Sequence, residues 1–288
     1  MKARALCLLA LVLLLAACGG PAPTPSPTPA PYRIIREVAY LPNGGANQKL
    51  DIYLPGRGSG PFPTLVAIHG GNSDKLHLVG LGINMAKKGY AVVSINHRLP
   101  PEVYPAPLED CFCALAWVHA HAGEYGFDSS RVVVWGFSAG GTLAALMGAI
   151  EDPARYLPNC PNALPQSGWL TGAVALSGLY DLANRDAVSE SVQDFWANVL
   201  GGQPNEKPGV WAEASPITWI DGKEPPFLVI NGEKDDVALA TEAERFAAAL
   251  RQAGAKVKLV IIPGADHGNA TNPDAQQALE EFLKGLGW

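Results

Sequence analysis

Residues 132–142 read Val-Val-Val-Trp-Gly-Phe-Ser-Ala-Gly-Gly-Thr, and this stretch decides the fold. The apolar β-branched run Val132 to Val134 predicts a buried strand, and the small residues from Thr142 to Ile150 predict a helix. Ser138 lies between them at the centre of a Gly-x-Ser-x-Gly pattern. Between a strand and a helix, this pattern predicts a strained turn that lifts the serine Oγ out at the top of a sheet.

The two glycines of the pattern, Gly136 and Gly140, have a steric reason to be there. Strand and helix nearly touch at such a turn, so a Cβ two residues to either side of Ser138 would clash. The pattern alone occurs by chance, and its position between a buried strand and a helix is what gives it weight. We therefore interpret Ser138 as a candidate nucleophile.

Apolar strands alternate with helical segments along most of the chain. The predicted strands are 32–41, 48–54, 65–68, 90–95, 131–135, 172–176, 227–230 and 257–262, and the predicted helices are 76–88, 106–122, 142–150, 239–253 and 274–286. The first two strands are expected to form an antiparallel hairpin around the turn at 43–45. This alternation predicts an α/β fold with a mostly parallel central sheet and helices on both faces.

Two stretches interrupt the alternation, namely 151–170 and 182–221. The first is rich in Pro, Asn and Trp, and the second contains Phe195 and Trp196. We expect both to form a small cap over Ser138, because loops beyond the carboxyl ends of parallel strands build ligand sites. The alternative is that the tryptophans only pack the interior of the cap.

Composition limits the classes of function. The chain has 288 residues, 48% hydrophobic and 17% charged, which is enough for one large core. Its formal net charge is −6 without a basic run, so nucleic acid and anionic membrane surfaces are unsuitable partners. No Cys/His/Asp cluster has metal-ligand spacing and no glycine-rich phosphate loop occurs, so neither a metal nor a cofactor is expected.

The first residues predict export. Lys2 and Arg4 precede an apolar stretch that is too short to span a bilayer and is typical of a signal peptide over 1–17. The sequence Leu-Ala-Ala-Cys that ends at Cys18 resembles the bacterial lipobox. That resemblance implies cleavage before Cys18 and lipidation of this cysteine, with ordinary secretion as the alternative.

A linker follows the predicted lipidation site. Proline at every other position from 21 to 31 cannot build a helix or a sheet ladder, so 18–31 is expected to be a stiff, extended spacer. The catalytic domain would then occupy 32–288, lipid-anchored to the outer face of a bacterial membrane.

A serine nucleophile needs a base and a carboxylate that orients the base. His267 lies in a loop just after the last predicted strand, where it could reach Ser138. Four other histidines, at 77, 97, 119 and 121, are expected to be surface or packing residues, and the sixth, His69, is expected to order the glycine loop that it opens.

The carboxylate is expected from the loop one strand before the histidine. Asp235 and Asp236 both lie there, and Asp181 is a weaker rival after the preceding strand. The chain order serine, aspartate, histidine is that of α/β-hydrolases. The glycines at 70 and 71 follow another strand, and their amides with that of Ala139 would form an oxyanion hole.

From about Tyr32 to its end the chain resembles the α/β-hydrolase superfamily, and within it the hormone-sensitive-lipase-like and BD-FAE-type esterases. The matching pieces are His-Gly-Gly at 69–71, Tyr-Pro-Ala-Pro-Leu-Glu-Asp at 104–110, Gly-Phe-Ser-Ala-Gly-Gly at 136–141, Ser-Pro-Ile at 215–217, Pro-Pro-Phe-Leu at 225–228, Gly-Glu-Lys-Asp at 232–235 and Gly-Ala-Asp-His-Gly at 264–268. Together they cover nearly the whole predicted domain.

The resemblance implies a role for each site residue. Asp235, third after Gly232, would be the triad acid, and the oxyanion donors would be Gly71, Asn72 and Ala139; Asn72 departs from the family, which often has a third glycine there. The implied function is a serine hydrolase of the carboxylesterase or acetylesterase type, acting through an acyl-enzyme on a small-molecule or polysaccharide-linked ester. The alternatives are an amide-cleaving relative, such as an arylformamidase or a peptidase, and a catalytically idle lipoprotein that binds a glycan.

The remaining cysteines carry little chemistry. Cys111 falls on the apolar stripe of the predicted helix 106–122 and is expected in the core. Cys113 points away from that stripe and could pair with Cys160, since an exported protein can hold a disulfide, or both could be free thiols.

Overall fold

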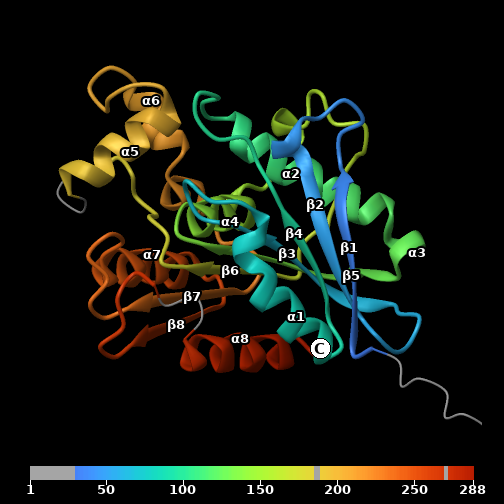
Figure 1. Cartoon of the computed structure of the whole chain (residues 1–288). Helices are drawn as coiled ribbons and strands as arrows, with labels where there is room; N and C mark the ends of the chain where they lie inside the picture. Colours follow the sequence, from blue (N-terminus) through green and yellow to red (C-terminus); the bar gives the residue numbers. More distant parts are fainter. Residues whose placement is uncertain (1–29, 185–188, 269–271) are drawn as a thin grey trace, which may run out of the picture.

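Eight strands form one sheet in the order β1-β2-β4-β3-β5-β6-β7-β8 (Figure 1). The computed structural model describes residues 30–184, 189–268 and 272–288, so the predicted signal peptide and Cys18 lie outside the described residues. The strands are β1 (Tyr32–Ala39), β2 (Lys49–Pro55), β3 (Phe62–Ile68), β4 (Ala91–Ile95), β5 (Phe127–Phe137), β6 (Gly172–Leu176), β7 (Phe227–Gly232) and β8 (Val257–Ile262). Strand β2 runs antiparallel to both of its neighbours, whereas the other pairs are parallel. The predicted α/β-hydrolase sheet with its opening hairpin is confirmed.

Helices cover both faces of the sheet. They are α1 (Val79–Lys87), α2 (Ala106–Ala120), α3 (Ala122–Tyr125), α4 (Ala139–Ala149), α5 (Glu190–Leu200), α6 (Pro208–Glu213), α7 (Ala240–Ala253) and α8 (Pro273–Gly285). Successive side chains of a strand point to opposite faces. Val66 and Ile68 of β3 therefore join the core under α2, α4 and α7, whereas Leu65 and Ala67 join the core under α1 and α8.

The central strands are apolar throughout because both of their faces are covered. All five residues of β4 and all five of β6 are buried, which explains why their sequences show no alternation of polar and apolar residues. Strand β5 begins at Phe127, earlier than predicted, and Phe62 of β3 pairs with it there across a register shift. The longer strand carries the chain directly to Ser138, which stands at the N-terminus of α4.

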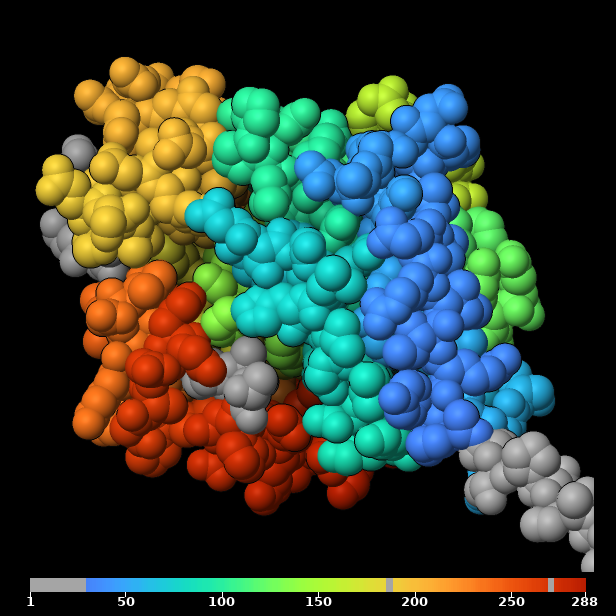
Figure 2. All heavy atoms as spheres, viewed as in Figure 1, coloured from blue at the N-terminus to red at the C-terminus, as the bar shows by residue number. Residues whose placement is uncertain are grey.

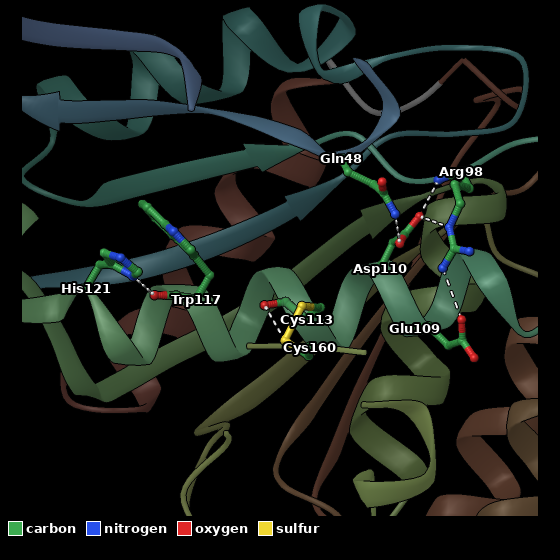
Figure 3. The surroundings of a disulfide bond; sticks show 8 residues. All are labelled: Gln48, Arg98, Glu109, Asp110, Cys113, Trp117, His121 and Cys160. Carbon is green, nitrogen blue, oxygen red and sulfur yellow. Dashed lines mark hydrogen bonds and ion pairs between the residues drawn. A yellow bond between two sulfur atoms is a disulfide. The ribbon is translucent and has the colours of Figure 1, made fainter. Parts of the chain in front are cut away.

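The prediction that both irregular stretches cover Ser138 is wrong for the first of them. Residues 151–170 follow helix α4 and not a strand, so they do not start at the edge of the sheet where Ser138 lies. They pack along α2 instead, where Tyr156 stacks on Phe112 with ring centroids 5.7 Å apart. Cys160 forms a disulfide with Cys113 of α2, as Figure 3 shows.

The second irregular stretch does form the expected cap. It contains α5 and α6, which stand together beyond the ends of β6 and β7 at the upper left of Figure 1. Trp211 is buried inside the cap, and its Nε1 donates to the carbonyl oxygen of Gly202. In the part of the chain that the structure describes, no helix is both long enough and apolar enough to cross a membrane.

Candidate active site

The turn from β5 to α4 holds Ser138 in a strained conformation. Its φ is +57° and its ψ is −125°, outside the regions that side-chain-bearing residues prefer. A Cβ on Gly136 would lie 1.9 Å from the carbonyl oxygen of Gly140, and a Cβ on Gly140 would lie 2.4 Å from that of His69. The strand, the turn and the loop after β3 can approach this closely only because both positions are glycine.

The structure brings Ser138, His267 and Asp235 together from three separate loops. Ser138 Oγ lies 2.9 Å from Nε2 of His267, and the Nδ1 of the same imidazole lies 3.0 Å from each carboxylate oxygen of Asp235. The Asp235 side chain is fully buried, whereas that of His267 is 23% exposed. A hydroxyl, an imidazole and a buried carboxylate in this sequence can activate the hydroxyl as a nucleophile.

Asp235 is held as an ionised acceptor. Its Oδ1 accepts hydrogen bonds from the amides of Val237 and Ala238, at 3.0 and 2.8 Å. Burial acts to raise the pKa of Asp235, but the hydrogen bonds from His267, the Ala238 amide and Ser177 outweigh it and lower the pKa below its ordinary value. The carboxylate therefore stays charged beside the imidazole at neutral pH.

The two rival carboxylates lie elsewhere. Asp236 is exposed on the surface of the same loop. Asp181 forms an ion pair with Arg245 of α7, with 2.7 Å between Oδ2 and Nη2. In the described part of the chain, the His267 ring hydrogen-bonds Ser138 and Asp235 and neither of these two carboxylates.

Two of the three residues expected to supply oxyanion donors lie at the cavity in front of Ser138. Gly71 and Ala139 both line the cavity there, but Asn72, the third expected donor, does not. Ala139 is the first residue of α4, where amides have no acceptor within the helix and the helix dipole favours negative charge. Asn72, the next residue after the glycine pair, has a φ of +53°, in the left-handed region.

The cavity in front of Ser138 has a volume of about 160 Å³. Its walls come from the loop after β3 that carries Gly71, the turn at Ser138, the loops after β6 and β7, and helix α5. Its lining residues include Ser177, Leu179, Val192, Phe195, Trp196, Val237 and His267. Figure 2 shows the surface hollowed between the yellow α5 region and the cyan segment that follows β3, with light-green atoms of the β5–α4 region at the bottom. The site is therefore open to a substrate from solvent.

A pair of buried histidines supports the loop that carries Gly71. The rings of His69 and His97 stack with centroids 4.3 Å apart, and Nδ1 of His69 donates to the carbonyl oxygen of Gly70 at 2.7 Å. Burial lowers the pKa of His69 to about 3, and burial also lowers that of His97. Both rings are therefore neutral at physiological pH and belong to the framework of the loop.

Sequence reasoning missed Ser177 and placed Phe195 in the cap without identifying its contact in the site. Ser177 follows β6, is buried at a φ of +50°, and hydrogen-bonds the Asp235 carboxylate. Its position directly after a predicted strand, next to the strand of the elbow, is a signal that could have identified it. Phe195 of α5 reaches Gly71 across the cavity, a long-range contact that no local pattern indicates. In the described ranges, no group of His, Cys, Asp and Glu side chains could hold a metal ion.

Comparison with known proteins gives relatives over most of this chain. The BD-FAE family model matches residues 50–250. Esterase LipQ of Mycobacterium tuberculosis is 33% identical over 244 residues, 80% of this chain and 56% of the relative, and Esterase LipC of the same organism is 31% identical over 216 residues, 72% and 53% of the two chains. This chain thus spans about half the length of the curated relatives that it matches.

Solved structures share the fold. A truncated carbohydrate esterase from gut microbiota superposes with a TM-score of 0.77 at 25% identity, covering 90% of this chain and 98% of that one. The bifunctional GH43-CE protein of Bacteroides eggerthii superposes with a TM-score of 0.79 at 28% identity, covering 88% of this chain and 38% of that one.

Proposed function

The chain belongs to the BD-FAE family, and from that membership we propose that it is a carboxylic ester hydrolase with Ser138 as nucleophile, His267 as general base and Asp235 as the carboxylate that orients the base. The observation that carries the proposal is the run of contacts from Ser138 Oγ through His267 to Asp235, at 2.9 and 3.0 Å. The names of the relatives, esterases and a carbohydrate esterase, support the same reaction class.

In the proposed reaction, Ser138 Oγ bonds to the ester carbonyl carbon while His267 Nε2 takes the hydroxyl proton. The carbon–oxygen bond to the alcohol then breaks, and His267 returns the proton to the departing alkoxide. A water molecule next adds to the acyl carbon, giving its proton to His267, and the bond to Ser138 Oγ breaks as that proton returns to the serine. One ester and one water become one acid and one alcohol, and the enzyme is restored.

We assign the oxyanion donors to the amides of Gly71 and Ala139, because both line the cavity beside Ser138. Donors fixed before the reaction stabilise the negative charge that develops on the carbonyl oxygen without having to reorganise. Asn72 was also expected to donate, but it does not line this cavity, so the proposal rests on the other two.

We also propose that the protein is exported and lipid-anchored at Cys18, with 1–17 as signal peptide, 18–31 as spacer and 32–288 as the catalytic domain. The fully extended spacer would hold the domain up to about 40 Å from the membrane. The Cys113–Cys160 disulfide supports export, since such bonds persist in oxidising compartments and are rare in the cytosol.

Fluorophosphonate labelling combined with a substrate panel tests the reaction. We expect the wild type to become labelled on Ser138 and to hydrolyse aryl esters, and we expect Ser138→Ala to do neither. The panel adds acetylated polysaccharide, feruloylated polysaccharide and matched anilides to identify the alcohol and to separate ester from amide cleavage. A folded wild type that neither labels nor turns over any of these substrates would contradict the proposed hydrolase, and glycan-binding measurements would then test the idle alternative.

A further inference from the structure

Two cavities adjoin the loop that carries Gly71, and they share a wall that includes the aromatic residues Phe195 and Trp196. The first is the 160 Å³ cavity that contains Ser138 and His267. The second has a free volume of only about 20 Å³ and lies among apolar side chains of the β4–α2 region, α4 and the cap, including Leu99, Pro107, Leu143, Leu146 and Val199. Both cavities are lined by Gly71, Ala139, Thr142, Phe195 and Trp196.

The chemistry assigns a different half of the substrate to each cavity. In the proposed function, on which this inference rests, His267 must give its proton to the leaving alcohol, so the alcohol lies on the side of the site that contains His267. That side is the larger cavity. The carbonyl oxygen lies at Gly71 and Ala139, so the acyl group is left to point past these residues toward the smaller cavity.

The smaller cavity has room for little more than one methyl group. A free volume of about 20 Å³ accommodates roughly one water-sized group. The ring of Phe195 packs directly on Gly71, a residue that both cavities share. A Cβ placed on Gly71 would lie only 2.3 Å from Cζ of Phe195, so the ring limits the smaller cavity at this point. Trp196 is buried and contacts the Phe195 ring edge-on, with 5.6 Å between the ring centroids, which limits the movement of that ring.

We propose that Phe195 sets the upper limit on the length of the acyl group, so that the enzyme takes acetyl esters and excludes butyryl and longer ones. Phe195 belongs to the wall that the two cavities share, and truncating its ring would open a path from Ser138 toward Leu146 and Val199. Phe195 is only partly buried and stands on the cap, so its truncation leaves the sheet and the core beneath it intact.

The test is the ratio of kcat/KM for p-nitrophenyl butyrate to that for p-nitrophenyl acetate, measured on one preparation of each variant. The ratio cancels the amount of active enzyme and any general loss of triad efficiency. We expect Phe195→Ala to raise this ratio at least about tenfold over the wild type, since discrimination by one or two methylenes in an apolar pocket is of that order. Phe195→Leu should give an intermediate ratio, and it carries the test alone if the alanine variant does not fold.

Asn198→Ala is the matched control, because Asn198 is exposed on the same helix and lines neither cavity. Its ratio should equal that of the wild type. A wild type that hydrolyses butyrate as well as acetate, or a Phe195→Ala variant with an unchanged ratio, would overturn the assignment of Phe195 and leave the esterase proposal standing. Absence of labelling and of hydrolysis in the wild type would instead overturn the proposed function itself.

Discussion

Ser138 and His267 are 129 residues apart in the chain, yet the serine Oγ lies 2.9 Å from the histidine Nε2. The sheet explains this meeting. Strands β5 and β8 are both members of its parallel portion, so the loops that follow them leave from the same edge. Asp235 follows β7, which lies between β6 and β8, and it thus reaches the other nitrogen of the imidazole.

Ser138→Ala should remove activity and preserve the fold. Only the Oγ is lost, and Ser138 stands at a strained turn with a φ of +57°. Because stability at such sites is often sacrificed to activity, the free energy of unfolding should change little. Hydrolysis of an aryl acetate should fall by about 10⁴- to 10⁶-fold. Steady-state assays and a thermal melt on the same two proteins check this, and retention of a tenth of the activity would show that Ser138 is not the nucleophile.

Asp235→Asn should lower kcat on the order of 10⁴-fold, because the amide would favour the wrong imidazole tautomer and remove the charge that stabilises the imidazolium. Asp236→Asn is the matched control, since Asp236 is the next residue and is exposed. Steady-state kinetics of the two variants, measured side by side, give the two values of kcat to compare. A larger loss in the Asp236 variant would contradict the assignment of the triad acid.

The sequence was sufficient to predict the elbow and the sheet, because their causes are local. Gly136 is required by its contact with Gly140 four residues later, and buried parallel strands are visible as apolar runs; the contact of Gly140 with the distant His69 carbonyl is not local and was not predicted. The path of 151–170 could not be predicted, because it is set by contacts with α2 that are distant in sequence, such as Tyr156 on Phe112. The contact of Phe195 with Gly71 was missed for the same reason, since Gly71 lies on a loop that is distant in sequence.

Cys113→Ser should destabilise the domain without disabling the triad. The disulfide to Cys160 closes a loop with a sequence separation of 47, and loss of that constraint on the unfolded chain is worth about 4 kcal/mol. The disulfide ties 151–170 to α2. Figure 3 shows it on the same helix as Asp110, which forms an ion pair with Arg98. Urea unfolding should show the loss, and kcat at 25 °C should stay near that of the wild type.

Reductant provides the internal control for this prediction. Dithiothreitol should lower the stability of the wild type toward that of Cys113→Ser and leave the variant unchanged, because the variant has lost the one disulfide found in the described residues and its Cys160 is already a thiol. Wild-type stability that does not respond to reductant under unfolding conditions would contradict a stabilising role for the bond.

Cys18→Ser should block lipidation. The proposed anchor needs the thiol at this position, so the variant should accumulate as uncleaved precursor, or be shed in soluble form if another peptidase acts. Metabolic labelling with a fatty-acid analogue, followed by fractionation, measures both outcomes. Equal labelling of the variant and the wild type would remove the lipobox interpretation while leaving the catalytic proposal untouched.

The stacked histidines should make the folded state sensitive to acid well before the carboxylates titrate. The pKa of His69 falls from an ordinary 6.5 to about 3 in the folded protein, and the pKa of His97 is also lowered. Between these values the unfolded chain binds protons that the folded protein does not, so the free energy of unfolding decreases as pH falls. Within that pH window, each histidine lowers the free energy of unfolding by up to about 1.4 kcal/mol for every unit by which the pH falls.

Replacing His97 by Phe separates this effect from general acid destabilisation. The variant keeps an aromatic ring against His69 but loses the titrating group and the Nδ1 donor to the Arg98 carbonyl, so it should be less stable at pH 7. The slope of its unfolding free energy between pH 4.5 and 6.5 should nevertheless be shallower, by up to about 1.4 kcal/mol per pH unit. Urea unfolding at several pH values gives both slopes, and parallel slopes would mean that His97 gains its proton as readily in the folded protein as in the unfolded chain.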